Sequence, residues 1–533
     1  MMCSCPMQNT STKIIILNRL SDLSSCSSAV VLIGSSIVEN FENMQCMLLT
    51  AMNGALLHCV QSNHYIYALY SKRNTSIESK IRMHAGKGVT SLPRPVWCAA
   101  GKGEMDATPD ATAASTSNNN DDDIKTLKTE RRRVTGKGKG AYKSLHLNTL
   151  MVECEGAESD PYDASMPPIY QTATFGQPNA TENGEYDYSR SGNPTRTALE
   201  MTMARLEGAE RALAFSSGMS ALAAVTRLLQ SGDHIVAGDD LYGGTSRLLA
   251  QVVPGAGIDV TNVDTTDVEA VRAAIVPGRT KLVMLESPTN PRMQICDIKA
   301  ISRMAKDAGA LTCVDNSILT PMYQMVLDLG ADISMTSATK FIGGHSDVTG
   351  GILAVRDAEL GKRLYFTQNA EGTGLGPMDC WLLLRGLKTM SLRMERQVEN
   401  AEKLVEWVRK QPLVTRINYA GLENHPGHAV HASQATSGGS LFSFTTGNEM
   451  VSKIICDNAR LFKITVSFGN VRSLISMPCF MSHASIPAEV RAARGLPNDL
   501  IRISAGIEHI DDLLGDLEYA FGLAQEYLDS KND

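Results

Sequence analysis

The 533-residue sequence is poor in aromatic residues, with 3 Trp and an aromatic fraction of 5%. It also lacks an apolar run of membrane-spanning length, because polar residues such as His58 and His64 break the uncharged stretch from Asn43 to Ser71. We therefore expect no transmembrane helix, while a signal-type apolar core at Met47–Leu57 remains an alternative. An apolar fraction of 43% beside 20% charged residues excludes a wholly disordered chain and predicts several folding units.

Paired C-x-x-C spacing is also missing, although the chain has 12 cysteines. Without such pairs neither a structural zinc site nor a disulfide framework has support, and we expect reduced thiols and no metal ion. The small net charge of −7 likewise gives no reason to expect binding to nucleic acid or to a membrane surface.

Acidic residues are few in the first hundred positions, where only Asp22, Glu39, Glu42 and Glu78 occur. A polar low-complexity stretch follows from Asp106 to Gly140. Such composition is typical of targeting and linker segments, which bury too little apolar surface to fold. We predict that residues 1–145 form a targeting and low-complexity extension that directs import into an organelle, either plastid or mitochondrion, with the cytoplasm as an alternative location.

Two basic motifs near the end of this extension favour a linker over a binding site. Residues 138–144 resemble a phosphate-binding loop, but Tyr142 stands where that loop needs glycine and no apolar strand precedes it. The triple arginine at 131–133 has neither interleaved aromatic residues nor a recognition helix.

From about residue 165 the pattern becomes that of an α/β protein, in which short apolar runs alternate with helical ones. We predict strands at Leu282–Glu286, Leu311–Asp315 and Ile333–Thr336, and a helix at Ile298–Ala308 between the first two. Strand–helix–strand order implies parallel pairing, so the carboxyl ends of these strands meet at one edge, where ligands bind.

The residues at that edge suit pyridoxal phosphate. Lys340 follows the third strand and could form a Schiff base with the cofactor, whereas Asp315 ends the second strand and could keep the pyridine nitrogen protonated. The hydroxyls of Ser337 and Thr339 could bind the phosphate. Taken singly, each residue could have an ordinary structural role, such as a surface lysine or a helix N-cap, but their order along the chain favours a cofactor-binding site.

Two upstream segments add to this site. Gly218 and Met219 open a helical pattern, and the free N–H groups at a helix start can hold a phosphate. Tyr242 follows the predicted strand His234–Ala237 and could lie over the cofactor ring.

Two hypotheses of a different class remain open. Ser337-Ala-Thr-Lys340 also reads as the S-x-x-K pattern of serine hydrolases, although the accompanying S-D-N and K-T-G motifs are incomplete here. A protein that binds the cofactor without turning over a substrate is the other alternative.

Several longer motifs identify residues 146–533 as similar to the Cys/Met-metabolism family of pyridoxal-phosphate enzymes. They are YDYSRSGNPTR (186–196), AFSSGMSALAAV (214–225), LESPTNP (285–291), VDNS (314–317), SATKFIGGHSD (337–347) and WLLLRGLKT (381–389). The resemblance implies the aspartate-aminotransferase fold, called fold type I, with a mostly parallel mixed sheet and a smaller C-terminal α/β domain. The domains implied are an N-terminal arm for subunit contacts (146–205), a cofactor domain (206–386) and a C-terminal domain (387–533).

The same resemblance assigns roles residue by residue. Tyr188 and Arg190 would be phosphate ligands donated by a second subunit, which implies a homo-oligomer, a tetramer in this family. Arg502 would bind the substrate carboxylate, with Ser467 as a second contact. Lys340 and Tyr242 would be the catalytic residues.

Within the family the sequence resembles the plant-type cystathionine β-lyases, and this resemblance implies that the extension directs the protein to the plastid stroma. It also implies α,β-elimination of L-cystathionine to homocysteine, pyruvate and ammonia in methionine biosynthesis, with cystine and related amino acids as further candidate substrates. Relatives that act at the γ-carbon commonly carry S-L-G-G-x-E-S-L, whereas Arg472 replaces the acid here. The swap favours β-elimination, and cystathionine γ-synthase and the cystathionine or methionine γ-lyases remain alternatives.

Overall fold

The computed structural model describes residues 50, 51, 54 and 55 and then 145–153, 162, 164–482, 484 and 488–532. The chain divides into two units, Met1–Ser115 and Thr116–Asp533. In the first unit β1 (Thr50–Ala51) pairs with β2 (Gly54–Ala55) in antiparallel fashion. The predicted linker Asp106–Gly140 and both basic motifs lie outside the described residues.

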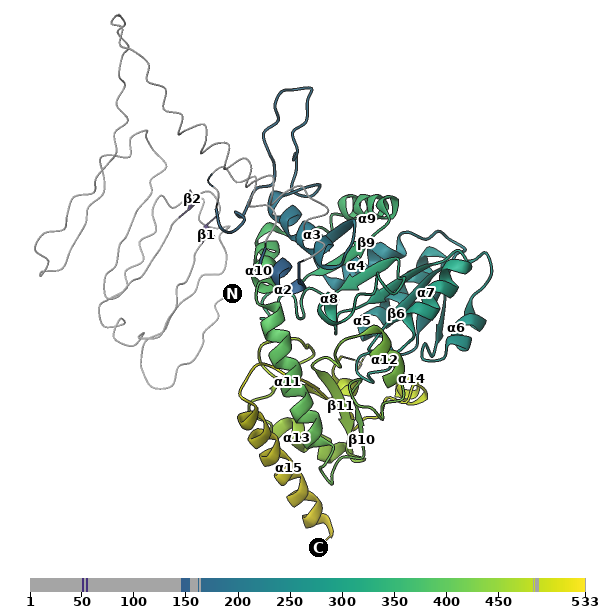
Figure 1. Cartoon of the computed structure of the whole chain (residues 1–533), viewed down its shortest axis with the longest axis vertical. Coiled ribbons are helices and arrows are strands. Elements are labelled where there is room, and N and C mark those ends of the chain that lie inside the picture. Colours follow the sequence, from purple (N-terminus) through teal and green to yellow (C-terminus); the bar gives the residue numbers. More distant parts are fainter. Residues whose placement is uncertain are drawn as a thin grey trace, which may run out of the picture. The chain divides into compact units, whose positions relative to one another are not determined.

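The second unit has a larger and a smaller α/β part, and the larger one is built on a seven-stranded mixed sheet (Figure 1). Its order is β3-β9-β8-β7-β6-β4-β5, in which β5, β4, β6, β7 and β8 run parallel and β9 runs antiparallel to both of its neighbours. The strands are β3 (Arg211–Phe215), β4 (His234–Gly238), β5 (Asp259–Val263), β6 (Thr280–Glu286), β7 (Leu311–Asp315), β8 (Ile333–Thr336) and β9 (Gly351–Val355). The predicted strands and the mostly parallel α/β fold are confirmed.

Helices connect these strands. The helix predicted at Ile298–Ala308 is α7 (Ile298–Asp307), which begins where the Asp297 side chain accepts a hydrogen bond from the backbone N–H of Ala300 at 2.9 Å. The others in this part are α2 (Leu147–Val152), α3 (Pro194–Leu206), α4 (Gly218–Thr226), α5 (Gly243–Arg247), η4 (Leu248–Val252), η5 (Val253–Ala256), α6 (Val268–Ala274), α8 (Thr320–Tyr323), α9 (Ala358–Glu371) and α10 (Pro377–Leu387).

The long helix α11 (Met390–Val408) runs from α10 toward a smaller α/β part that ends at the C-terminus (Figure 1). Its five-stranded sheet has the order β10-β11-β14-β13-β12. The strands are β10 (Arg416–Asn418), β11 (Leu441–Thr445), β12 (Lys463–Ile464), β13 (Leu474–Ser476) and β14 (Ile501–Ser504). The helices are α12 (His428–Gln434), α13 (Glu449–Asn458), η6 (Pro478–Phe480), α14 (Ala488–Ala493) and α15 (Ile510–Asn532).

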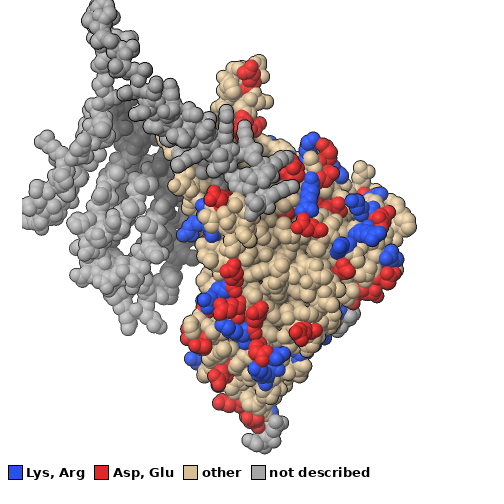
Figure 2. All heavy atoms as spheres, viewed as in Figure 1, with Lys and Arg blue, Asp and Glu red and all other residues tan. Residues whose placement is uncertain are grey.

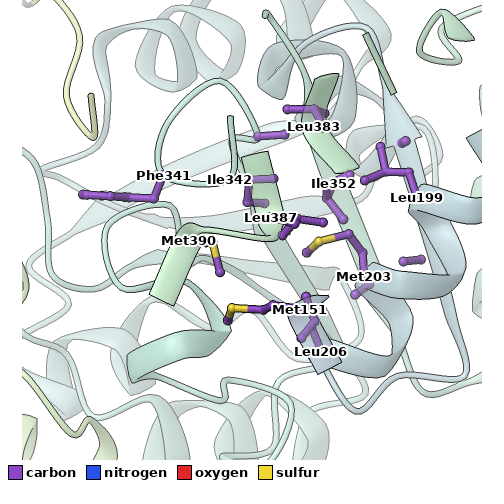
Figure 3. Close-up of a cluster of buried hydrophobic side chains, with 14 of the residues drawn as sticks. Met151, Leu199, Met203, Leu206, Phe341, Ile342, Ile352, Leu383, Leu387 and Met390 are labelled. Carbon is purple, nitrogen blue, oxygen red and sulfur yellow. The ribbon is translucent and has the colours of Figure 1, made fainter. Parts of the chain in front are cut away.

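One hydrophobic core cluster includes residues of the segment that follows β8 and carries Lys340. Figure 3 shows Phe341 and Ile342 of that segment in one cluster with Leu383 and Leu387 of α10 and with Ile352 of β9. All are between 0 and 1% exposed. Burying a side chain of this size contributes about 1.5–3 kcal/mol, so the two residues directly after Lys340 hold the backbone at that position.

Acidic and basic side chains are interspersed over the face in Figure 2, beside a broad uncharged area. Among the described residues no helix is long and apolar enough to span a bilayer.

Candidate active site

A cavity of about 200 Å³ lies at the carboxyl ends of the parallel strands. It brings together seven of the residues predicted from the sequence: Gly218, Met219, Tyr242, Asp315, Ser337, Thr339 and Lys340. They come from α4, from the end of β7 and from the segments that follow β4 and β8, so the shared sheet edge accounts for their meeting.

Lys340 is joined to the C-terminal domain. Its Nζ donates a hydrogen bond to Ser467 Oγ at 2.9 Å and lies 4.9 Å from the centroid of the Phe468 ring. Burial lowers the pKa of Lys340 to about 8, the Arg502 charge adds to this effect, and Asp315 opposes it. At pH 7 about a tenth of this amine is therefore unprotonated and able to act as a nucleophile or a base.

Two buried carboxyl groups lie at the ends of adjacent strands. Glu286 ends β6 and Asp315 ends β7, and the two are paired in the register of the sheet. Burial raises the pKa of both, and the nearby Asp315 charge raises that of Glu286 further, well above its usual range. Hydrogen bonds with Ser317 and, to a smaller extent, the positive charge of Lys340 act on Asp315 in the opposite direction, so Asp315 is the more readily ionised of the two.

The part of the cavity wall at Gly218 suits a phosphate. Helix α4 begins at Gly218 with a capping box between Ser217 and Ser220, which uses the N–H groups of those two serines but not those of Gly218 and Met219. A Cβ on Gly218 would lie 3.0 Å from Met335 Cε and 3.4 Å from Ser337 Oγ, so glycine leaves this part of the wall open. N–H donors, hydroxyl groups and a buried carboxyl group in one cavity match the donor set that pyridoxal phosphate requires.

Tyr242 and Thr339 also line the cavity. Tyr242 is 39% exposed and stands just before α5, where its ring lies against Gly244: a Cβ there would be 2.5 Å from Tyr242 Cε1. Glycine at 244 thus allows the ring to lie flat against the backbone. Thr339 Oγ1 accepts a hydrogen bond from Gly350 N at 3.0 Å, which fixes its hydroxyl next to Lys340.

Arg502 reaches the same region from β14 although it is only 2% exposed. One terminal nitrogen donates to Asn290 Oδ1 at 2.9 Å and the other to the Ser467 carbonyl at 2.8 Å, while its Nε has no hydrogen-bond partner among the described residues. Burial lowers the pKa of Arg502 to about 10, so the guanidinium stays charged at neutral pH. Two of its contacts are fixed, and neither Arg502 nor Ser467 is among the residues that line the cavity, although the neighbours Val466 and Phe468 are.

Tyr188 and Arg190 do not line this cavity. Tyr188 is 43% exposed, the Arg190 guanidinium lies 5.1 Å from the centroid of its ring, and Arg190 Nε donates to Asn369 Oδ1 at 3.3 Å. They belong to a largely exposed segment that projects above α3 in Figure 1. Within one subunit they are not brought to the predicted phosphate site.

Ten of the residues that line the cavity had no predicted role, and three of these, Glu286, Asn290 and Phe468, contact predicted residues or their neighbours. Glu286 could have been found, because it is an acid at the end of an apolar predicted strand next to the one that ends in Asp315. Phe468 gave no such signal, since its place beneath Lys340 depends on how the two domains pack.

The geometry also bears on the S-x-x-K hypothesis and on metal binding. The side-chain amine of Lys340 donates to Ser467 Oγ, whereas its contact with Ser337, the serine which that pattern would activate, is a backbone hydrogen bond to the Ser337 carbonyl. Within the described part of the chain no three His, Cys, Asp or Glu side chains are grouped to hold a metal ion.

Comparison with known proteins gives strong matches. The model of the family described as "Cys/Met metabolism PLP-dependent enzyme" matches residues 148–522. The chain is 56% identical over 417 residues to the chloroplastic cystathionine β-lyase of Arabidopsis thaliana, which covers 78% of this chain and 87% of that protein. It is 57% identical over 374 residues to the corresponding enzyme of Mimosa pudica, which covers 70% and 81%.

Solved structures agree. Cystathionine γ-lyase from Lactobacillus plantarum, complexed with L-serine, superposes with a TM-score of 0.70 at 40% identity and covers 72% of this chain and 100% of its own. Cystathionine γ-synthase from Xanthomonas oryzae, in complex with cystathionine, has a TM-score of 0.70 at 38% identity and covers 72% and 99%. On these matches and on its fold, the chain belongs to the family of pyridoxal-phosphate-dependent enzymes of cysteine and methionine metabolism.

Proposed function

We propose that this enzyme is a cystathionine β-lyase, which converts L-cystathionine and water to homocysteine, pyruvate and ammonia. The observation that carries the proposal is the amine of Lys340, which lines the cavity with Asp315 and donates to Ser467 Oγ, and whose pKa is lowered to about 8 chiefly by burial. The two plant relatives described above carry the name cystathionine β-lyase, which supports this substrate.

Bound pyridoxal phosphate supplies an electron sink that makes the Cα proton of the amino acid acidic. Gly218 and Met219, with the hydroxyls of Ser337 and Thr339, would hold its phosphate, and Asp315 would face its ring nitrogen. Tyr242 would cover one face of the ring.

The protein's own groups would then do the proton transfers. Arg502 would hold the substrate carboxylate and so direct Cα toward Lys340. The neutral amine of Lys340 would remove the Cα proton and then give a proton to the departing sulfur. One amine within reach of both atoms can serve as base and as acid.

The choice of β- over γ-elimination rests on the relatives rather than on Arg472. Arg472 Nε donates to the Leu461 carbonyl at 3.1 Å, and the residue is not among those that line the cavity. The cystathionine γ-lyase of Bacillus subtilis is 47% identical over 376 residues, so γ-elimination is the second candidate function.

We also propose a homo-oligomer in which Tyr188 and Arg190 of one subunit complete the phosphate site of the next. The support is that both are exposed and outside the cavity of their own chain. A two-fold arrangement would bring identical arms to both sites, and a tetramer would be a pair of such dimers. We place the mature enzyme in the plastid, as the names of the plant relatives suggest.

Product analysis tests the function. Purified enzyme incubated with L-cystathionine should release pyruvate and homocysteine in equal amounts. Release of 2-oxobutyrate and cysteine would establish γ-elimination instead. A yellow, folded protein that released no product from any thioether amino acid would support the non-catalytic alternative, and covalent labelling of Ser337 by penicillin would support the serine hydrolase.

A further inference from the structure

Glu286 has no part in the proposed chemistry, yet both of its carboxyl oxygens are used. The residue is 6% exposed and ends β6. Its Oε2 accepts a hydrogen bond from the backbone N–H of Tyr242 at 3.0 Å, and its Oε1 accepts one from the backbone N–H of Asn290 at 2.9 Å. One side chain therefore joins the loop after β4 to the loop after β6.

Each of these loops carries a residue that faces the cofactor or the substrate. The first places the Tyr242 ring against Gly244 at the cavity rim. The second places the Asn290 side chain, whose Oδ1 accepts the hydrogen bond from Arg502 at 2.9 Å. Since Asn290 is 2% exposed and Arg502 is 2% exposed, neither can relax toward solvent without opening the core.

We propose that Glu286 is a positioning residue of the active site, whose carboxyl group fixes the Tyr242 ring and, through Asn290, the orientation of Arg502. The inference rests on the proposed function of the same cavity. It predicts that one substitution disturbs two features at once, the environment of the cofactor ring and the binding of a substrate carboxylate.

A carboxyl group suits this task better than an amide. Both of its oxygens can accept a hydrogen bond, whereas glutamine offers one acceptor and would turn an N–H donor toward the second backbone N–H. Burial and the neighbouring Asp315 raise the pKa of Glu286, while the hydrogen bonds from the backbone N–H groups of Tyr242 and Asn290 act in the opposite direction.

The test compares Glu286→Gln with the wild-type holoenzyme in two measurements that need no turnover. The first is the circular dichroism of the bound cofactor in its visible absorption band. The second is the dissociation constant for L-alanine, an amino acid without a leaving group on Cβ, measured from the change in cofactor absorbance. We expect a weaker dichroic band and a dissociation constant raised by about tenfold, as for the loss of one buried hydrogen bond.

Glu200→Gln is the matched control. Glu200 Oε1 accepts a hydrogen bond from the backbone N–H of Ala214 at 2.8 Å, and its carboxyl lies 3.8 Å from Arg196 Nε. It does not line the cavity. The control should lower the melting temperature while the dichroic band and the affinity for L-alanine stay at wild-type values.

Wild-type values of both measurements in Glu286→Gln would overturn the proposal, as would equal losses in Glu200→Gln. If Glu286→Gln does not fold, Glu286→Asp keeps the carboxyl group on a side chain one methylene shorter. The same weaker dichroic band and lower affinity for L-alanine are then expected. Failure of both variants to fold would show that the carboxyl serves the fold alone and would also overturn the proposal. Should wild-type enzyme release no pyruvate from cystathionine while Glu286→Gln shows both losses, the proposed function fails and the positioning role stands.

Discussion

Lys340 and Ser467 are separated by 127 positions in the chain and are joined by a hydrogen bond of 2.9 Å. Lys340 follows the last parallel strand of the large sheet, and Ser467 belongs to the C-terminal domain. Arg502 donates to the carbonyl of the same serine. The amine and the guanidinium are therefore oriented by one residue, so the site depends on the packing of the two domains.

The lowered pKa of Lys340 predicts how the cofactor-free enzyme takes up pyridoxal phosphate. Only the neutral amine reacts, so the rate of uptake should rise with pH and level off just above pH 8, because burial lowers the pKa to about 8. The Arg502 charge lowers this pKa and Asp315 raises it. Stopped-flow absorbance should show a higher midpoint for Arg502→Gln and a lower one for Asp315→Asn. A wild-type midpoint near the ordinary value of 10.5 would contradict this account.

Glu207 predicts a pH dependence of stability. It is 1% exposed beside Ser334 and Thr336, and burial raises its pKa from 4.5 to about 7. Because the folded protein holds the proton of Glu207 more tightly than the unfolded chain does, the protonated carboxyl group favours the folded state. This contribution to the free energy of unfolding is fully present below pH 4.5 and is lost as the pH rises through 7. Urea titrations of the cofactor-free protein should therefore show that Glu207→Gln raises the free energy of unfolding at pH 8, by up to about 3 kcal/mol.

Glu359→Gln provides the comparison for that experiment. Glu359 is 76% exposed and its Oε1 accepts a hydrogen bond from Lys362 Nζ at 2.6 Å. Exposed pairs of this kind contribute about 0–1 kcal/mol, so the free energy of unfolding of this variant at pH 8 should stay close to that of wild type. A Glu207→Gln protein that was no more stable at pH 8 than wild type would refute the prediction.

Shared active sites predict complementation. Arg190→Ala and Lys340→Ala subunits should each be inactive alone. After random subunit exchange, half of the dimers are mixed and each mixed dimer has one intact site, so about one quarter of wild-type activity should return. Pyruvate release after mixing measures this. Absence of activity in a sample where mass spectrometry detects mixed dimers would disprove sharing.

The extension predicts that catalysis needs no residue before about 141. A protein that begins at Ala141 should keep full activity and cofactor content, because the motifs of the site begin after that position. A fluorescent fusion of residues 1–140 should enter the plastid. Loss of folding in the shortened protein, or a fusion that stays in the cytosol, would contradict this prediction.

Most of the residues expected to bind the cofactor could be predicted from the sequence, because each stands at the end of a strand or the start of a helix. Strand ends in a parallel sheet share an edge, so Asp315 and Lys340 could be placed together from β7 and β8 alone. Gly218 and Met219 could be placed from the start of a helix. The division into domains at 145, 205 and 386 and the roles of the site residues stay predictions.

The substrate side depends on contacts that no local pattern encodes. Phe468 lies 4.9 Å from Lys340 Nζ and 5.8 Å from Arg502 Cζ, measured to its ring centroid. Its position follows from the packing of the C-terminal domain. Asn290 belongs to the motif LESPTNP (285–291), but its hydrogen bond to Arg502 spans 212 positions and could not be inferred from spacing.

Covalent mapping of the cofactor tests the central claim most directly. Holoenzyme reduced with borohydride and digested should give one peptide that carries the phosphopyridoxyl group. The account predicts that this group is on Lys340, in the peptide that contains Ser337 and Thr339. A modified lysine elsewhere in the chain, or a yellow enzyme in which Lys340 stays unmodified after reduction, would contradict it.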